Sequence, residues 1–331
     1  MSFFAVLFAL LAEQLKPLSN LNPIHHGLTG WVRWVGRNFD AGEDTHARIV
    51  WAVTVVAPAA MIAGLYVLTN RYSTVMALGL DVAILYLTLG FRQFSHHFTD
   101  IRDALEAGRE DRARELLAHW QNLDASELPR TEILRHVLEY SLLAAHRHVF
   151  GVFFWFVALS TLGLGPAGAV LYRMAEFASR YWSYRSQVTG VSTHDRLMSL
   201  SQTLFSLVDH VPARLTAFGF AVVGNFEDAV DAWRRHAVLW VRPNEGTILS
   251  AASGALGVRL GGQVAPASDD GKDVSRTLTQ GDAPDVIEAQ GSTTGAAPQM
   301  AHLRSVVGLI WRSVVLWMLL LALLSLANLI G

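Results

Sequence analysis

A single acidic side chain interrupts a long apolar run, and it is the first residue in this sequence that could take part in chemistry. Asp81 lies within Thr74–Phe91, which holds no other charged residue. A charge at the centre of a membrane helix costs about 2.5–3.5 kcal/mol on insertion scales unless it is paired. Asp81 could contact an ion or ligand inside a helix bundle, pair with a basic residue such as Arg147 or Arg173, or lie near the membrane interface. The sequence leaves these interpretations open.

The rest of the sequence contains no cysteine, no histidine spacing typical of a metal site and no nucleotide-binding glycine motif. The chain has no cysteine, which excludes disulfides, thiolate zinc sites and cysteine nucleophiles. Histidines next to each other on a helix point about 100° apart and do not share a metal ion. The closely spaced histidines are therefore predicted to be surface or interfacial residues, and no metal site is predicted: His25, His26, His96, His97, His146 and His148. The sequence also contains neither a P-loop nor a dinucleotide-binding glycine motif.

Apolar runs of membrane-spanning length dominate the rest of the sequence. Of the 331 residues, 52% are hydrophobic and 16% are charged, a balance that places part of the chain in lipid and part in water. Ile49–Thr69 is uncharged and long enough to cross about 30 Å of hydrocarbon as a helix. Ser313–Ile330 is a further uncharged run. We predict an all-α fold, a polytopic helical membrane protein with a cytoplasmic helical region and a disordered loop before the last transmembrane helix.

Composition divides the chain into six segments. Arginines flank both ends of the first apolar hairpin, and this bias predicts that both flanks lie in the cytoplasm. A stretch rich in Gly, Ser, Asp, Ala and Thr near the C-terminus cannot bury enough apolar surface to order itself. The predicted segments are an N-terminal amphipathic or interfacial segment (1–48), a transmembrane hairpin (49–91), a cytoplasmic helical region (92–148), a membrane-embedded or re-entrant segment and core (149–260), a disordered linker (261–302) and a C-terminal transmembrane helix (303–331).

The apolar run Val149–Tyr172 has two interpretations. Gly163, Gly165 and Pro166 lie near its middle, and proline removes a helical donor and disturbs the preceding turn. The run either crosses the bilayer once as a kinked helix or turns back as a re-entrant hairpin. Arginines outnumber acids in the residues that follow, which favours the hairpin.

Separated motifs, in the expected order, resemble the CobD/CbiB superfamily. Val32–Arg37 is similar to its V-R-W-[IV]-G-R run, and Ala104–Leu128 is similar to its cytoplasmic helical hairpin. Pro243 with Asn244, and the tail run Gly254–Gly262, resemble its P-N and G-A-L-G-x-x-L-G-G motifs. The resemblance implies membrane enzymes that attach an aminopropanol phosphate arm to adenosylcobyric acid.

Other segments resemble the AmpE branch of the same superfamily. Gly165–Arg173 and Val208–Pro212 are similar to that branch. The resemblance implies the superfamily's fold and a link to the regulation of β-lactamase induction, without the cobalamin reaction.

The acidic motif of the enzymes is largely replaced in this chain. Their E-T-x-A-E-N-x-x-D-G motif corresponds to Glu139–His148, where only the first glutamate is kept. Five positions at which the resemblance implies polar or acidic groups hold Leu143, Ala144, Arg147, Phe205 and Leu249. A site that loses its carboxylates cannot hold Mg²⁺ in the usual oxygen cage.

Two functions follow from the resemblance and from these departures. The first hypothesis is an AmpE-like protein with a degenerate catalytic site and a binding, sensing or regulatory role in the cell envelope. The alternative is an adenosylcobinamide-phosphate synthase, an amide ligase of cobalamin biosynthesis, and only this alternative implies Mg²⁺ and a corrinoid substrate. Its candidate catalytic residues are Asp124, Glu139, Glu176 and Asp209. The ligand-binding candidates under either hypothesis are Arg33, Arg37, Asp81, Arg173, Arg214, Asn244 and Arg259.

The expected partner is the lipid bilayer of the bacterial inner membrane, which the chain should cross several times. Other membrane proteins or a second copy of the chain are further candidates. The net charge of −2 supplies no positive field to gather phosphate backbones, so no nucleic-acid partner is expected.

Overall fold

The computed structural model describes residues 2–15, 23–39, 44–121, 125–189, 193–262 and 291–330. The all-α class is confirmed, because these residues form helices and only two isolated bridges, Val258–Ala296 and Gly261–Ser292. The helices are α1 (Ser2–Leu15), α2 (Pro23–Phe39), α3 (Asp44–Tyr72), α4 (Thr74–Thr88), α5 (Phe91–Glu106), α6 (Glu110–Gln121), α7 (Arg130–Ala145), the π-helix η1 (His146–Phe150), α8 (Gly151–Thr161), α9 (Ala167–Thr189), α10 (Thr193–Val223), α11 (Phe226–His236), the 3-10 helix η2 (Ala237–Leu239), α12 (Pro243–Leu256) and α13 (Met300–Ile330).

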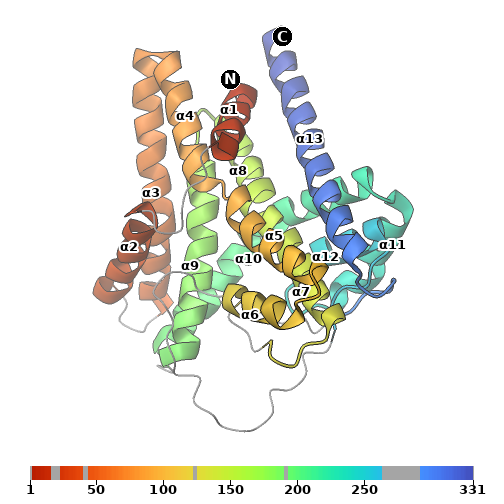
Figure 1. Ribbon diagram of the computed structural model, residues 1–331. Helices are drawn as coiled ribbons and strands as arrows, with labels where there is room; N and C mark the ends of the chain where they lie inside the picture. The colour runs from red at the N-terminus through yellow and green to blue at the C-terminus, as the bar shows by residue number, and fades with distance from the viewer. Residues whose placement is uncertain are drawn as a thin grey trace.

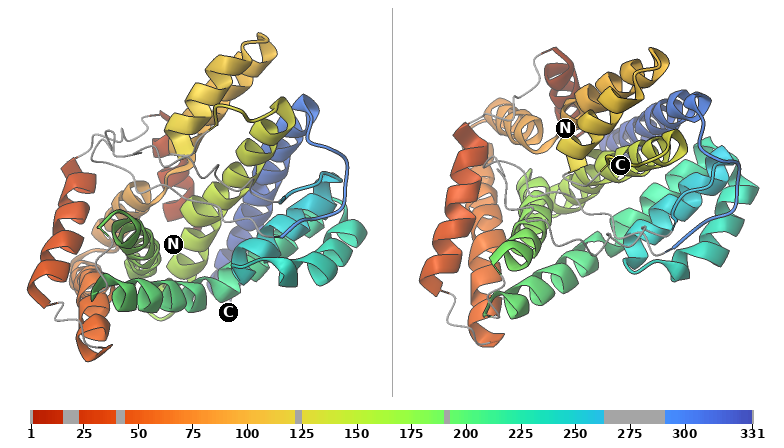
Figure 2. Two further views of the ribbon diagram at one scale, coloured as in Figure 1. Left: turned by 90° about the horizontal axis from the view of Figure 1, so that it is seen from below. Right: turned by 60° about the horizontal axis from the view of Figure 1, so that its bottom comes forward.

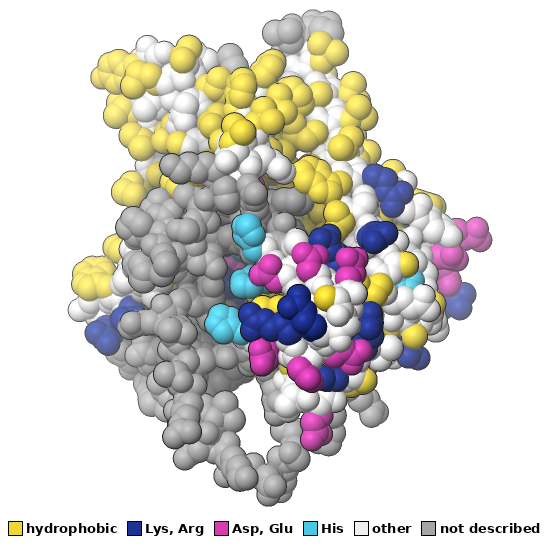
Figure 3. Space-filling view, in the orientation of Figure 1, with side chains coloured by type: hydrophobic (Ala, Val, Ile, Leu, Met, Phe, Trp, Pro, Cys, Tyr) yellow, Lys and Arg dark blue, Asp and Glu magenta, His cyan; other side chains and the backbone are white. Residues whose placement is uncertain are grey.

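One end of the molecule is apolar and the other is polar. Helices α1, α3, α4 and the end of α13 stand side by side at the upper end in Figure 1, and hydrophobic side chains cover that end in Figure 3. Charged side chains gather lower down, over α5 and α6. Among the described residues, three helical stretches are long and apolar enough to cross a membrane: Thr45–Tyr72, Arg130–Thr161 and Met300–Ala327. This division fits a chain that lies partly in lipid and partly in water.

Helices α3 and α4 form the antiparallel hairpin that the sequence predicts. They are joined at Ser73 and run in opposite directions (Figure 1), so that α2 and α5 leave them toward the same polar end. Helix α1 packs beside α4. The depth at which these helices enter the bilayer stays a prediction.

The run Val149–Tyr172 turns back instead of continuing as one kinked helix. α8 ends at Thr161, and α9 begins at Ala167 and packs along α8 in the opposite direction. The turn between them needs glycine at position 165, because its φ is +55° and a Cβ there would overlap the ring of Tyr66. How deeply the turn lies in the bilayer stays a prediction.

Residues 130–148, which composition assigns to the cytoplasmic region, belong to the same continuous helical stretch as the apolar α8. Four of their polar side chains are buried within the protein: Arg135 is 4% exposed, Glu139 0%, His146 1% and Arg147 7%. Charges that are paired inside a helix bundle give the same composition as charges that face water, so the boundary of the cytoplasmic region stays a prediction.

The predicted linker 261–302 begins and ends inside ordered structure. Gly262 N–H donates to Gly291 C=O, and Thr293 N–H donates to Leu260 C=O, while α13 already begins at Met300. Composition could not reveal this pairing, because the two paired segments, 260–262 and 291–293, are far apart in the sequence. Residues 263–290 between them lie outside the described part. Gly261 has φ +76°, and a Cβ there would overlap Gly291 C=O, so the tail motif needs glycine at this point.

Candidate functional site

The main group of buried polar side chains lies where η1, α9, α10 and α12 meet. We call it the bundle network. Its members are His146 and Arg147 on η1, Tyr172, Arg173, Glu176 and Arg180 on α9, Asp209, Arg214 and Thr216 on α10, and Asn244 and Glu245 on α12, with Arg242 directly before α12.

Asp209 is the centre of the bundle network and is only 5% exposed. Its Oδ1 accepts a hydrogen bond from Tyr172 OH at 2.8 Å and lies 2.7 Å from His146 Nε2. Its Oδ2 accepts a longer bond from Asn244 Nδ2 at 3.3 Å. The second ring nitrogen of His146, Nδ1, lies 2.8 Å from Thr216 Oγ1. A carboxylate that contacts an imidazole in this way can take up or pass on a proton.

A π-helical turn and a glycine bring these groups together. The N–H of Gly151 bonds to His146 C=O five residues back, which widens the helix between α7 and α8. Such turns are rare and occur frequently at functional sites. The phenol ring of Tyr172 occupies the space that a Cβ on Gly151 would fill. The ring of Tyr172 can therefore lie against this helix, with its hydroxyl on Asp209.

Two groups of ion pairs extend the bundle network. Arg147 Nη2 donates to Glu245 Oε1 at 2.7 Å, and Arg242 Nη1 donates to the same oxygen at 3.0 Å. On α9, Glu176 pairs with Arg173 at 3.0 Å and with Arg180 at 3.1 Å. Each of these two carboxylates thus pairs with two arginines. Arginine side chains match the geometry of phosphate and carboxylate groups.

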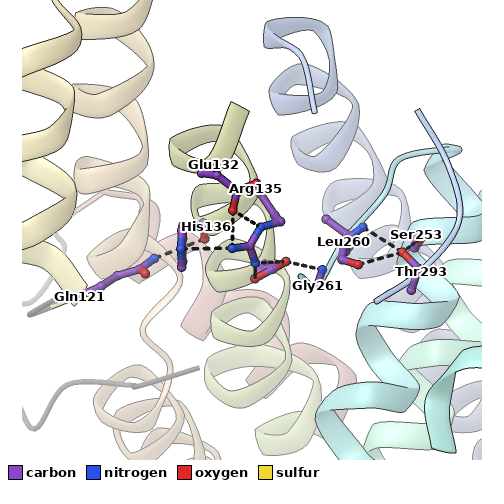
Figure 4. A network of polar contacts seen from close by, with 9 residues as sticks. Gln121, Glu132, Arg135, His136, Ser253, Leu260, Gly261 and Thr293 are labelled. Carbon is purple, nitrogen blue, oxygen red and sulfur yellow. Dashed lines mark hydrogen bonds and ion pairs between the residues drawn. The ribbon is translucent and has the colours of Figure 1, made fainter. Parts of the chain in front are cut away.

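A second buried group ties α7 to the tail run, and Figure 4 shows it. We call it the loop network. Its members are Gln121, Glu132, Arg135, His136, Glu139, Ser253, Leu260, Gly261 and Thr293.

Arg135 lies between two carboxylates in the loop network. It donates to Glu132 at 2.6 Å and to both oxygens of Glu139 at 3.0 Å. Glu139 is fully buried and also accepts the backbone N–H of Gly261 at 2.6 Å. On the far side of the tail run, Thr293 Oγ1 accepts a hydrogen bond from Leu260 N–H at 2.8 Å. These bonds fix the tail run against α7.

Comparison with known proteins identifies the family. The family described as CobD/Cbib protein matches residues 6–290. The chain belongs to the CobD/CbiB family. It is 30% identical over 281 residues to a cobalamin biosynthesis protein CobD of Stutzerimonas stutzeri, covering 85% of this chain and 82% of that protein. No solved structure matches.

Two further relatives carry the same description. The cobalamin biosynthesis protein CobD of Chromobacterium violaceum is 33% identical over 181 residues, or 55% of each chain. The one from Leptospira interrogans is 26% identical over 201 residues, or 58% of this chain and 60% of that protein. These names favour the cobalamin hypothesis over the AmpE-like one.

Five residues that the sequence analysis selects in this CobD/CbiB family member meet in the bundle network. They are Arg173, Glu176, Asp209, Arg214 and Asn244. Arg214 Nη1 donates to Asn244 Oδ1 at 3.4 Å, and Asn244 Nδ2 donates to Ser206 C=O at 2.8 Å. Three different helices thus bring together residues that lie up to 71 positions apart in sequence.

The remaining candidates lie elsewhere. Glu139 belongs to the loop network, Arg33 and Arg37 lie on α2, and the exposed Arg259 follows α12. Asp81 is 4% exposed on α4, and its Oδ1 has no hydrogen-bond partner in the described part of the chain. Asp124 lies outside the described residues. The roles of all these residues stay predictions.

His146, predicted to be a surface or interfacial residue, does not lie on the protein surface, because it is 1% exposed. Sequence spacing alone could not reveal this, because His146 contacts residues 63 and 70 positions further along the chain. Tyr172, Arg147 and Glu245 are not among the site residues predicted from the sequence. The sequence indicates a possible role for Glu245 only through its position next to Asn244 of the P-N motif.

The donors present do not form a cage for Mg²⁺. In the described residues no group of three or more His, Asp or Glu side chains could hold a metal ion, and Asp209, Glu176 and Glu245 are already bonded to protein donors. We therefore derive no chemical step through a metal ion.

Proposed function

We propose that this CobD/CbiB family member is an amide-forming enzyme of cobalamin biosynthesis that joins an aminopropanol phosphate arm to adenosylcobyric acid at the bundle network. The observation that carries this proposal is the buried pair of Asp209 and His146, which lies close to several arginines. The relatives named as cobalamin biosynthesis proteins support the same pathway.

The bundle network has the groups that amide formation requires. A carboxylate oxygen would first take the terminal phosphoryl group of a nucleoside triphosphate, which releases the nucleoside diphosphate. The amine nitrogen would then bond to the acyl carbon, and inorganic phosphate would leave. Arginines such as Arg147, Arg173 and Arg242 would hold the phosphate groups. The attacking amine must lose a proton as its nitrogen bonds to the acyl carbon, and Asp209 with His146 would accept that proton.

The AmpE-like role remains the second candidate, because apolar residues stand close to the proposed site. Phe205, at a position where the resemblance implies an aspartate, packs against Tyr172 with ring centroids 5.8 Å apart. Leu143 and Leu249 are 2% and 0% exposed. Apolar groups at these positions favour binding over catalysis. Under either function we propose a multi-pass protein of the bacterial inner membrane, as the three candidate spans support.

Growth of a synthase-deficient strain on cobyric acid as the sole corrinoid source tests the proposed function. We expect the wild-type chain to restore growth and Asp209→Asn to abolish it, because loss of a proton acceptor commonly costs about 10²–10⁴-fold in rate. Glu115→Gln on the exposed face of α6 is the matched control. If wild-type protein is present in the membrane but growth fails, the AmpE-like role is favoured.

A further inference from the structure

Helix α10 presents an apolar stripe that the described part of the chain leaves exposed. We call it the outer stripe: Leu207 (72% exposed), Val211 (48%), Leu215 (39%), Phe218 (50%) and Val222 (45%). With 3.6 residues per turn these five side chains fall within an arc of about 80°. Water-exposed apolar patches of this kind are uncommon and mark an interaction surface.

The opposite side of α10 faces the bundle network. Asp209 and Thr216 point inward and are 5% and 1% exposed, and Ala213 and Phe220 on the same side are fully buried. A single helix therefore separates the proposed site from whatever contacts the outer stripe.

Two tryptophans place α10 beside membrane-spanning helices. Trp155, in the candidate span that ends with α8, donates its Nε1–H to Val208 C=O at 3.1 Å. Trp317, in the candidate span of α13, has its Nε1 3.5 Å from the position of a Cβ on Gly219. These contact points, Val208 and Gly219, directly follow Leu207 and Phe218 of the outer stripe in the sequence. The outer stripe therefore lies at the depth of both tryptophans.

The hydrogen bond from Trp155 also satisfies a backbone carbonyl of α10 that has no helical donor. Pro212 has no N–H, so the carbonyl of Val208, four residues earlier, loses its helical donor. An unpaired carbonyl is costly in hydrocarbon, and the bond from Trp155 satisfies this one.

From these observations we propose that α10 lies across the bundle at the membrane interface and that its outer stripe contacts lipid acyl chains. The left view of Figure 2 shows α10, in green to teal, along its length, while α9 is seen nearly end-on. The occupant is the acyl-chain layer of the bilayer, because α10 packs directly against the helices of two candidate spans, α8 and α13. The bundle network would then lie at the depth of the lipid headgroups. This inference does not depend on the proposed reaction.

Spin labels on single cysteines test the proposal, and the chain offers a background without native cysteine. Leu207→Cys, Val211→Cys, Leu215→Cys and Phe218→Cys would each carry a nitroxide in the full-length protein, reconstituted in phosphatidylcholine–phosphatidylglycerol vesicles. Collision with O₂, which concentrates in lipid, is compared with collision with a water-soluble nickel chelate. Leu320→Cys on α13, 53% exposed, is the lipid control, and Glu115→Cys on α6 is the water control.

We expect all four labels to favour O₂, as Leu320→Cys does. Preference for the nickel chelate, as at Glu115→Cys, would overturn the proposal because the stripe would then face water. Shielding from both reagents together with dipolar broadening between labels would overturn it in favour of a second copy of the chain. Each variant is first compared with wild type by size exclusion in detergent, and the four positions supply independent readings.

Discussion

The bundle network and the loop network are both buried and rich in charge, yet they differ in how each carboxylate is held. In the loop network Glu139 is matched by Arg135 and by a backbone N–H, and no neutral proton-transfer group touches it in the described residues. In the bundle network Asp209 is held by a phenol, an imidazole and an amide. Burial of an acid alone therefore does not indicate a working site. The partners indicate whether the acid stabilises the fold or can exchange a proton.

The loop network should show the largest effect on stability. We expect Arg135→Met to lower the free energy of unfolding by about 3–5 kcal/mol, because it leaves the fully buried Glu139 without its cation. The measurement is unfolding in mixtures of dodecyl sulfate and mild detergent. Arg135→Met combined with Glu139→Leu should recover most of the loss. If the single variant were as stable as wild type, the two networks would not differ as we describe.

The packing of Gly151 on Tyr172 should give the next largest effect. Gly151→Ala would push a methyl group into the phenol ring, and overpacking of this kind costs about 1–3 kcal/mol. We also expect lower product formation per folded molecule, since Tyr172 would shift away from Asp209. Gly64→Ala is the matched control, because nothing lies within 4 Å of a Cβ there. Equal effects at both glycines would contradict this packing.

The bond from Trp155 to Val208 should give the smallest effect. We expect Trp155→Phe to destabilise the protein by about 0.6–2 kcal/mol, the range for polar contacts between membrane helices. In a Pro212→Ala background the restored N–H can serve the carbonyl of Val208, so the same substitution should cost less. A double-mutant cycle of unfolding energies measures this difference. A coupling energy of zero would mean that the indole does not replace the missing helical donor.

Sequence could predict the parts that rest on local pattern. The apolar runs predict α3, α4 and the end of α13 as membrane helices, because hydrophobicity over about 20 residues determines whether a helix can span lipid. Resemblance selected Asp209, Glu176 and Asn244 although they lie on three helices.

The remainder depends on contacts between distant residues. His146 has no spacing signal, since its partners come from α10 and its position depends on a π turn. Within residues 130–148, Arg135, Glu139 and Arg147 are paired inside the bundle, and composition cannot distinguish such charges from charges that face water. The ordered ends of the predicted linker depend on pairing across residues 263–290.

The most direct test compares Asp209→Asn with Glu139→Gln in one preparation. Wild type and both variants are expressed in membranes, the folded amount is measured by fluorescence-detected size exclusion, and the amide product is measured by mass spectrometry. We expect Asp209→Asn to keep its folded yield and to lose product by a factor on the order of 10² or more. Glu139→Gln should lose folded yield while product per folded molecule stays near that of wild type. The reverse outcome, with product lost per folded molecule only at Glu139, would place the working site in the loop network and contradict the division between the two networks.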